Sequence, residues 1–397
     1  MSKYSQLSVM LGAVFIMATS AIGPGFLTQT AVFTEQFKSN LAFAIVASIV
    51  IDIGVQLNIW RIIAISRKRG QEIANIVLPG LGTLIAFLIV IGGLAFNIGN
   101  VGGAGLGLNV MLGIDPMVGA LLSAAFAVGV FAWKEAGKIM DKVAQLMGVV
   151  MLLVTAWICF KTNPPVAEAV SKVFKPDDIS VLIFPMITLI GGTVGGYITF
   201  AGGHRLLDAG ISGIENVDKV SKSATTGILV TGAMRILVFL AVLGVVATGA
   251  HLDPANPPAS AFRLAAGDLG YKFFGVVIWC AAITSIIGAA YTSVTFLQGF
   301  HPFFEEKRNL ITMGFIILSS LCLVVVGRPV TILVIVGSLN SFVLPLALGA
   351  MLLAAYNKKI VGDYKHPKWL LFFGLVALAI TIVAEYYAVG ALIKFWQ

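Results

Sequence analysis

The stretch from Leu7 to Glu35 reads LSVMLGAVFIMATSAIGPGFLTQTAVFTE, an apolar segment that is interrupted in its middle. Pro24 removes a backbone donor and clashes with the preceding turn, and the flanking Gly23 and Gly25 add conformational freedom. The segment is therefore predicted to form two half-helices joined by unwound backbone. Inside a bilayer, unpaired peptide groups are tolerated only where they are buried in protein or line a cavity. Gly23, Pro24, Gly25 and Phe26 are therefore predicted to bind substrate.

Composition indicates a polytopic membrane protein. The 397 residues are 58% hydrophobic and only 11% charged, with a mean hydropathy of +0.98, whereas soluble domains are typically about 25% charged. The lipid bilayer is thus a predicted partner, in the plasma membrane. The net charge of +8 does not indicate nucleic acid, because the basic residues form short clusters between apolar runs. The cysteines lie inside apolar segments and predict neither disulfides nor a zinc site.

A window of about 20 apolar residues divides the chain into successive helical spans and predicts an all-α fold. Counting Lys and Arg between the spans favours a cytoplasmic N-terminus and an external C-terminus. The predicted spans are eleven: 7–32, 40–65, 79–112, 116–134, 137–161, 179–204, 222–250, 271–299, 309–327, 329–356 and 368–393.

A second interruption lies in the sixth span. The run Phe184 to Arg205, FPMITLIGGTVGGYITFAGGHR, carries three glycine pairs. A single pair could serve close helix packing, but three in one span favour unwinding. Breaks in the first and sixth spans are typical of an inverted-repeat transporter. The first repeat would cover residues 7–161, the second 179–356, and 368–393 would be an additional helix in one transmembrane domain.

These motifs resemble those of the natural resistance-associated macrophage protein (NRAMP) family of divalent-metal transporters. That family has Asp-Pro-Gly-Asn in the first span, and this chain has Gly-Pro-Gly-Phe at 23–26. In the sixth span, Gly-Ala-Thr-Val followed by Met-Pro-His is matched by Gly-Gly-Thr-Val followed by Gly-Gly-Tyr at 191–197. The family belongs to the amino acid-polyamine-organocation superfamily. The resemblance therefore implies the LeuT-like fold of 5+5 inverted repeats with helices 1 and 6 broken.

The chain departs from the family at the residues that carry the family's chemistry. The positions of the family's metal ligands in the two breaks are Gly23, Phe26 and Gly195. None of them offers the carboxylate, imidazole or thioether donor that manganese or ferrous iron needs, so no metal-binding residue is predicted. The family's histidine is replaced by Tyr197.

The family's acidic pair on a proton route is also absent. The Asp-Leu-Ala-Glu pattern of its third span is here Asn-Ile-Gly-Asn, with Asn97 and Asn100 in place of the two acids. Amide side chains do not take up and release protons near neutral pH. The two asparagines are therefore kept only as pathway candidates.

The broken helices retain features that suit a small organic anion or an amino acid-like substrate. A half-helix that begins at Pro24 would present the N–H groups of Gly25, Phe26 and Leu27, and such a helix N-terminus attracts a carboxylate. Phe26 and Tyr197 could form a wall beside it, although Phe26 could equally be packing only. The remaining predicted substrate-binding residues are Thr193, Gly195 and Gly196.

Two ionisable residues, Asp52 and Arg235, lie in the middle of predicted spans, where each is costly to bury. One interpretation is a structural pair that lowers the cost of both. The other is functional: Asp52 carries a coupling proton, and Arg235 attracts an anionic substrate. The four histidines are predicted to be solvated.

The function predicted from sequence is secondary-active transport of a small organic anion or amino acid-like substrate by alternating access, with symport of a proton or Na+. The first alternative is transport of a divalent metal cation such as Mn, Fe or Mg, and the second is a non-transporting sensor. Nothing resembles a catalytic triad or a phosphate loop, so an enzyme is not predicted. No cofactor is predicted.

Overall fold

The computed structural model describes residues 3–133, 136–254, 256–326 and 343–396, and these are almost entirely helical. Three single 3-10 turns connect some of the helices, at Lys38–Asn40, Ser180–Leu182 and Ile214–Asn216. The α-helices are α1 (Lys3–Ala21), α2 (Pro24–Phe37), α3 (Leu41–Ser66), α4 (Gly70–Val77), α5 (Leu81–Leu112), α6 (Pro116–Ala132), α7 (Ala136–Thr162), α8 (Val166–Phe174), α9 (Ile183–Val194), α10 (Ile198–Asp208), α11 (Val217–Val246), α12 (Pro257–Thr295), α13 (Pro302–Glu306), α14 (Arg308–Val326), α16 (Val343–Ala354), α17 (Lys358–Val361) and α18 (Lys368–Trp396).

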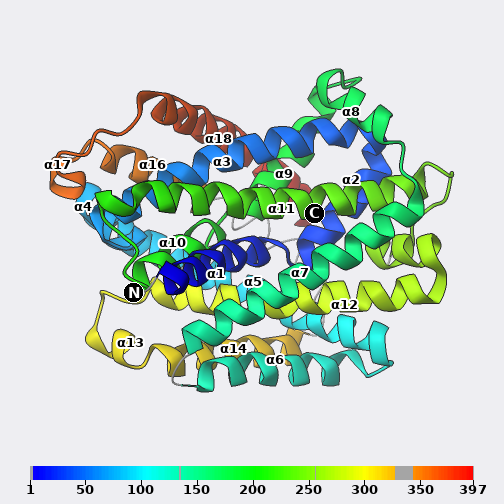
Figure 1. Cartoon of the computed structure of the whole chain (residues 1–397), viewed down its shortest axis with the longest axis horizontal. Coiled ribbons are helices and arrows are strands. Elements are labelled where there is room, and N and C mark those ends of the chain that lie inside the picture. Colours follow the sequence, from blue (N-terminus) through cyan, green and yellow to red (C-terminus); the bar gives the residue numbers. More distant parts are fainter. Residues whose placement is uncertain (1–2, 134–135, 255, 327–342, 397) are drawn as a thin grey trace.

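The long helices run roughly along one axis and form a bundle. Figure 1 shows α4, α13 and α17 at the end of the bundle where the N-terminus lies, which we call the N-terminal end, and α8 near the opposite end. α12 is the most enclosed candidate span, with 83% of its most apolar window buried. It packs against α5, α7, α1 and α2. The first helix pair is therefore held at the centre of the bundle.

The lengths of the helices agree with a membrane-spanning bundle. Within the described residues, 7 helical stretches are long and apolar enough to cross a membrane, and four shorter apolar helices accompany them. The all-α prediction is confirmed. Residues 327–342, which include the first half of the predicted tenth span, lie outside the described part. The count of eleven, the repeat boundaries and the orientation of the termini therefore stay predictions.

Both predicted helix breaks are present. α1 ends at Ala21 and α2 begins at Pro24, so Ile22 and Gly23 form the first break. α9 ends at Val194 and α10 begins at Ile198, and Gly196 between them has a φ of +53°, a conformation that glycine adopts at little cost.

The break in the sixth span lies at one of its three glycine pairs, Gly195 and Gly196. Gly191 and Gly192 are helical within α9, and Gly202 and Gly203 are helical within α10. A Cβ atom on Gly202 would lie 2.2 Å from the Trp60 ring. The pair at 202–203 therefore permits close packing of α10 against α3.

The first break is fixed by its neighbours on α5 and α12. A Cβ atom on Gly103 of α5 would lie 2.2 Å from Pro24 Cγ, so this glycine makes room for the proline. Ser285 of α12 donates a hydrogen bond of 2.9 Å to the Thr19 carbonyl at the end of α1. These contacts hold the start of α2 against α5 and the end of α1 against α12.

Candidate substrate site and gate

The site is built around the N-terminus of α2. Pro24 occupies the first turn of this helix, and Gly23 precedes it in an extended conformation. Leu27 N–H donates to the Gly23 carbonyl at 3.3 Å, so the expectation that it is free was wrong. Among the described residues, no acceptor is found for the N–H groups of Gly25 and Phe26. These two donors give the break a partial positive charge.

Arg235 of α11 adds a full positive charge to this region. Its side chain is 1% exposed, and the guanidinium carbon lies 4.2 Å from the centre of the Phe26 ring. One nitrogen, Nη1, donates to Thr193 Oγ1 at 2.9 Å and to the Leu189 carbonyl at 3.1 Å. Nε and Nη2 have no hydrogen-bond partner within the described structure. Phe26 is thus a cation–π partner and not packing alone.

Asp52 of α3 lies close to Arg235 without a direct ion pair. It is fully buried, and neither carboxylate oxygen has a hydrogen-bond partner among the described residues. The charges of Asp52 and Arg235 interact, with Thr193 beside both. The two residues therefore lie at matching depths. Because the Asp52 oxygens and two Arg235 nitrogens have no hydrogen-bond partner in the described structure, they are available to bond a ligand.

Tyr197 and Asn100 lie on the other side of the first break. Tyr197 is fully buried, its ring makes an edge contact with Phe96 at 5.7 Å between centroids, and its hydroxyl has no described partner. Asn100 is also fully buried, and its Oδ1 would lie 3.2 Å from a Cβ atom on Gly23. Any such side chain at position 23 would crowd Asn100, so glycine leaves this amide facing the break.

Asn97 does not join Asn100 at the break. Its Nδ2 donates to Ser319 Oγ on α14 at 3.1 Å, in a buried contact. At the two positions where the family resemblance implies an acidic pair, the Asn100 amide lies at the break and the Asn97 amide bonds to the Ser319 hydroxyl. Neither contact forms a charged proton route.

Gln29 is a site residue that the sequence reasoning missed. Its Oε1 is buried without a described partner. Both Gln29 Oε1 and Arg235 Nη2 approach Gly192, at 3.2 and 3.9 Å from the position of a Cβ atom there. A helical spacing of three from Phe26 places Gln29 on the same face of α2, and that spacing was the available signal.

The predicted site residues thus fall into one central group and one outlier. Gly23, Pro24, Gly25, Phe26, Thr193, Gly195, Gly196 and Tyr197 lie at or beside the two breaks, with Asp52, Asn100 and Arg235 next to them, while Asn97 points to α14. Within the described residues, no group of three or more His, Cys, Asp or Glu side chains could hold a metal ion. The central group is rich in hydrogen-bond donors and contains one carboxylate, that of Asp52.

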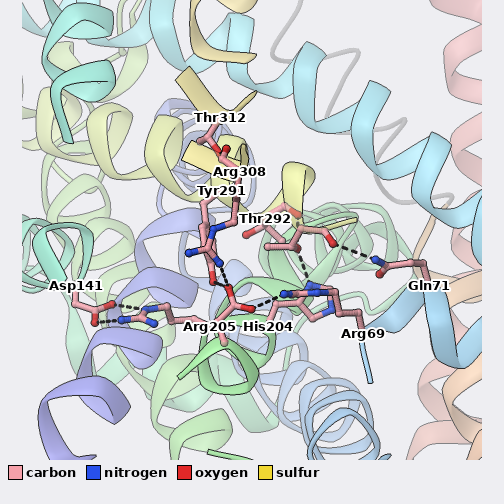
Figure 2. A network of polar contacts seen from close by, with 11 residues as sticks. Arg69, Gln71, Asp141, His204, Arg205, Tyr291, Thr292, Arg308 and Thr312 are labelled. Carbon is pink, nitrogen blue, oxygen red and sulfur yellow. Dashed lines mark hydrogen bonds and ion pairs between the residues drawn. The ribbon is translucent and has the colours of Figure 1, made fainter. Parts of the chain in front are cut away.

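A polar network joins several helices at the N-terminal end of the bundle, and the sequence reasoning missed it. Figure 2 shows Arg69, Tyr291 and Arg308 converging on one carboxylate, which belongs to Asp208 at the end of α10. Arg308 Nη1 donates to Asp208 Oδ2 at 2.7 Å. Asp208 therefore ties α10 to α12, to α14 and to the segment before α4.

Further contacts extend this network, which we call the Asp208 network. Arg205 Nε donates to Asp141 Oδ1 of α7 at 2.9 Å, and His204 Nδ1 lies 2.7 Å from Thr295 Oγ1 of α12 (Figure 2). Gly70 N–H donates to His204 Nε2, so this imidazole is neutral with its hydrogen on Nδ1.

His204 is thus fully buried, and its predicted solvation was wrong. His366 is also buried, so the same prediction fails there.

Comparison with known proteins identifies the family. The family model described as natural resistance-associated macrophage protein-like matches residues 14–391. The uncharacterized membrane protein YcsG of Bacillus subtilis (strain 168) is 57% identical over 396 residues, covering 100% of this chain and 98% of that protein. The divalent metal cation transporter MntH of Vibrio campbellii is 22% identical over 298 residues, covering 72% of this chain and 68% of that protein.

A solved structure supports the fold. The crystal structure of the Eremococcus coleocola manganese transporter, in complex with an aromatic bis-isothiourea substituted compound, superimposes with a TM-score of 0.76. The superposition covers 98% of this chain and 88% of the manganese transporter chain, and the two sequences are 14% identical. The predicted LeuT-like fold is confirmed by this match. The chain is an integral membrane protein and belongs to the natural resistance-associated macrophage protein-like (Nramp) family of transporters.

Proposed function

We propose that this chain is a secondary carrier that binds a small organic anion at the two helix breaks and moves it by alternating access. The observation that carries the proposal is the buried Arg235 guanidinium over Phe26, with two nitrogens unpartnered in the described structure. A carboxylate could accept from these nitrogens and from the N–H groups of Gly25 and Phe26. The Phe26 and Tyr197 rings would contact the apolar part of the substrate.

Electrostatics supports an anion over a bare divalent cation. At an effective dielectric of about 20, a carboxylate about 4 Å from a guanidinium is attracted by about 4 kcal/mol. A divalent ion about 6 Å away is repelled by roughly 5 kcal/mol under the same conditions. While Asp52 is ionised, its negative charge reduces both the attraction of the carboxylate and the repulsion of the divalent ion. The available metal donors are the single carboxylate of Asp52 and neutral oxygens such as those of Thr193, Gln29 and Asn100.

Divalent-metal transport is the second candidate, and the comparisons favour it over the organic anion. The relative MntH is named as a divalent metal cation transporter, and the matching solved structure is named as a manganese transporter. These likenesses are 22% and 14% identical. The relative at 57% identity is described as an uncharacterized membrane protein. The family relationship thus supports metal, while the side chains at the breaks support an anion.

Asp52 is the candidate carrier of a coupling proton. While Asp52 is ionised, it competes with the substrate for Arg235, and the two side chains together are neutral. A proton on Asp52 would leave Arg235 with a net positive charge and thereby favour the bound anion. One proton and one monovalent anion would then move together. The charged residue that acts on Asp52 in the described structure is Arg235 of α11.

A thermal-shift titration of the purified protein tests the substrate class. A ligand that binds only the folded protein raises its melting temperature by mass action. We expect small monocarboxylates or amino acids to raise the melting temperature. At 100 times its Kd, such a ligand adds about 2.7 kcal/mol to the free energy of unfolding. Manganese and magnesium should leave the melting temperature unchanged.

Two results would count against the proposal. Stabilisation by manganese without any response to carboxylates would favour the metal candidate. A lack of response to both classes would favour the non-transporting sensor.

A further inference from the structure

A cavity outside the transport site lies at the N-terminal end of the bundle. It has a volume of about 440 Å³, is partly open to the surface, and is lined by residues of the turn after α16, of α17 and of the segment that leads to the start of α18. The predicted orientation places this end in the cytoplasm. None of the side chains at the helix breaks lines the cavity, so it is separate from the transport site.

The cavity carries a net positive charge. Lys358, Lys365 and Lys368 line it, are exposed, and have no ion-pair or hydrogen-bond partner for their ammonium groups in the described structure. Asp363 is the one carboxylate among the lining residues. Burial, assisted by the charge of Arg61, lowers the pKa of His366 to about 4, so this histidine is neutral near pH 7. Three cations therefore face a single anion.

His366 offers an acceptor beside these cations. Asn58 Nδ2 donates to the carbonyls of Gly54 and Leu370, at 2.8 and 3.0 Å. Asn58 Oδ1 must then accept from His366 Nε2, which is 2.8 Å away. The other ring nitrogen, Nδ1, is left with a lone pair and is buried without a described partner. A ligand with both an anionic group and a hydroxyl would satisfy the lysines and this nitrogen.

The surroundings of the cavity match the headgroup level of a bilayer. Trp369 and Phe372 on α18 are 65% and 68% exposed, and Leu353 of α16 and Tyr356 in the turn after it are 66% and 58% exposed. Exposed Trp and Tyr side chains at the ends of apolar helices are typical of the membrane interface. A ligand in the cavity would therefore have apolar helix surface beside it, as an acyl chain requires.

We propose that this cavity binds the headgroup of an anionic phospholipid that carries a hydroxyl, such as phosphatidylglycerol. The phosphate contacts the three lysines, a headgroup hydroxyl donates to His366 Nδ1, and an acyl chain lies along α16 or α18. Basic pockets on the cytoplasmic side of membrane proteins bind anionic headgroups by this chemistry. Because His366, which lies just before α18, bonds to Asn58 of α3, the lipid would stabilise the contact between these two segments.

Native mass spectrometry of the full-length protein, with thermal shift, tests this site. We expect phosphatidylglycerol to bind and to raise the melting temperature, while phosphatidylcholine has little effect. A variant with Lys358→Gln, Lys365→Gln and Lys368→Gln should bind phosphatidylglycerol at least about 10-fold more weakly, since each cation near an anionic lipid contributes about 1 kcal/mol. The lysines are exposed and unpartnered in the described structure, so the variant is expected to fold.

The matched control removes the same charge elsewhere at this end of the bundle, with Lys68→Gln, Lys222→Gln and Lys307→Gln. It should bind phosphatidylglycerol like the wild type. Equal weakening in both triple variants would overturn the proposal in favour of general charge attraction. Tight binding of glycerol 1-phosphate, which has no acyl chain, would overturn the lipid as ligand. None of these outcomes depends on which substrate the carrier moves.

Discussion

Replacing Arg235 by glutamine is expected to lower uptake of a small organic anion by roughly 100-fold or more, because truncating one partner of a buried charge pair costs about 2–5 kcal/mol. The substitution removes the guanidinium that lies over Phe26 and donates to Thr193. Arg235→Lys keeps the charge but loses the planar set of donors, so it should recover only part of the uptake. Initial uptake rates in proteoliposomes measure both effects.

Loss of folding must be separated from loss of function in this experiment. Arg235→Gln leaves Asp52 buried without its opposite charge, which destabilises a protein by about 3–5 kcal/mol. The double variant Arg235→Gln/Asp52→Asn should recover the melting temperature but not the uptake. Arg61→Gln is a matched control, because Arg61 lies on α3 and bonds to Tyr364 and Ser221; it should transport normally. Anion uptake at wild-type rates in the double variant would exclude Arg235 from substrate binding.

Asp52→Asn alone tests the coupling step. If protonated Asp52 favours the bound anion, wild-type uptake rises as the external pH falls, and the asparagine variant has a flatter profile. The same uptake assay over a range of pH gives the answer. An unchanged pH profile would remove Asp52 from the coupling mechanism.

Replacing Asp208 by asparagine is expected to open the N-terminal end of the bundle. Its carboxylate accepts from Arg69, Tyr291 and Arg308, and its side chain is only 9% exposed. Removing one member of such a buried network costs about 3 kcal/mol, which corresponds to a shift of roughly 100-fold in the closed-to-open equilibrium. Transport would slow, because the carrier would spend less time closed at this end.

A single cysteine reports this opening. With the native cysteines replaced by alanine, Ser293→Cys lies on α12 next to Gly93, where the wild-type side chain is fully buried. Its rate of labelling by a maleimide should rise at least about 10-fold in the Asp208→Asn variant. Glu215→Gln is the control, since it breaks the exposed pair with Arg67 at the same end and should leave labelling unchanged. Equal labelling in all three proteins would refute a gating role for the Asp208 network.

The two breaks could be predicted because their causes are local. Proline in the interior of a helix removes a backbone donor and clashes with the preceding turn whatever its neighbours, and the glycines beside Pro24 permit the unwound backbone. The glycine pair at 202–203 shows the limit of such reasoning. Unwinding and close packing both require a residue without a Cβ atom, and the decision depends on Trp60, which is distant in sequence.

The Asp208 network was missed for a related reason. Arg69 and Asp208 are 139 positions apart, and charges at helix ends usually face water. Burial of such charges depends on how the helix ends converge, which no local pattern records. Asp52 and Arg235 were found because a charge inside an apolar span is costly wherever the other helices lie. That they form no direct ion pair in the described structure, and that Arg235 donates to Thr193 instead, required the structure.

Uptake by the wild-type protein in proteoliposomes tests the central claim most directly. Vesicles with an inward proton gradient would be given either a panel of labelled small carboxylates and amino acids or radioactive manganese, with protein-free vesicles as the blank. The account predicts that at least one organic anion accumulates and that manganese does not exceed the blank. Strong manganese uptake, with no accumulation of any organic anion, would contradict it.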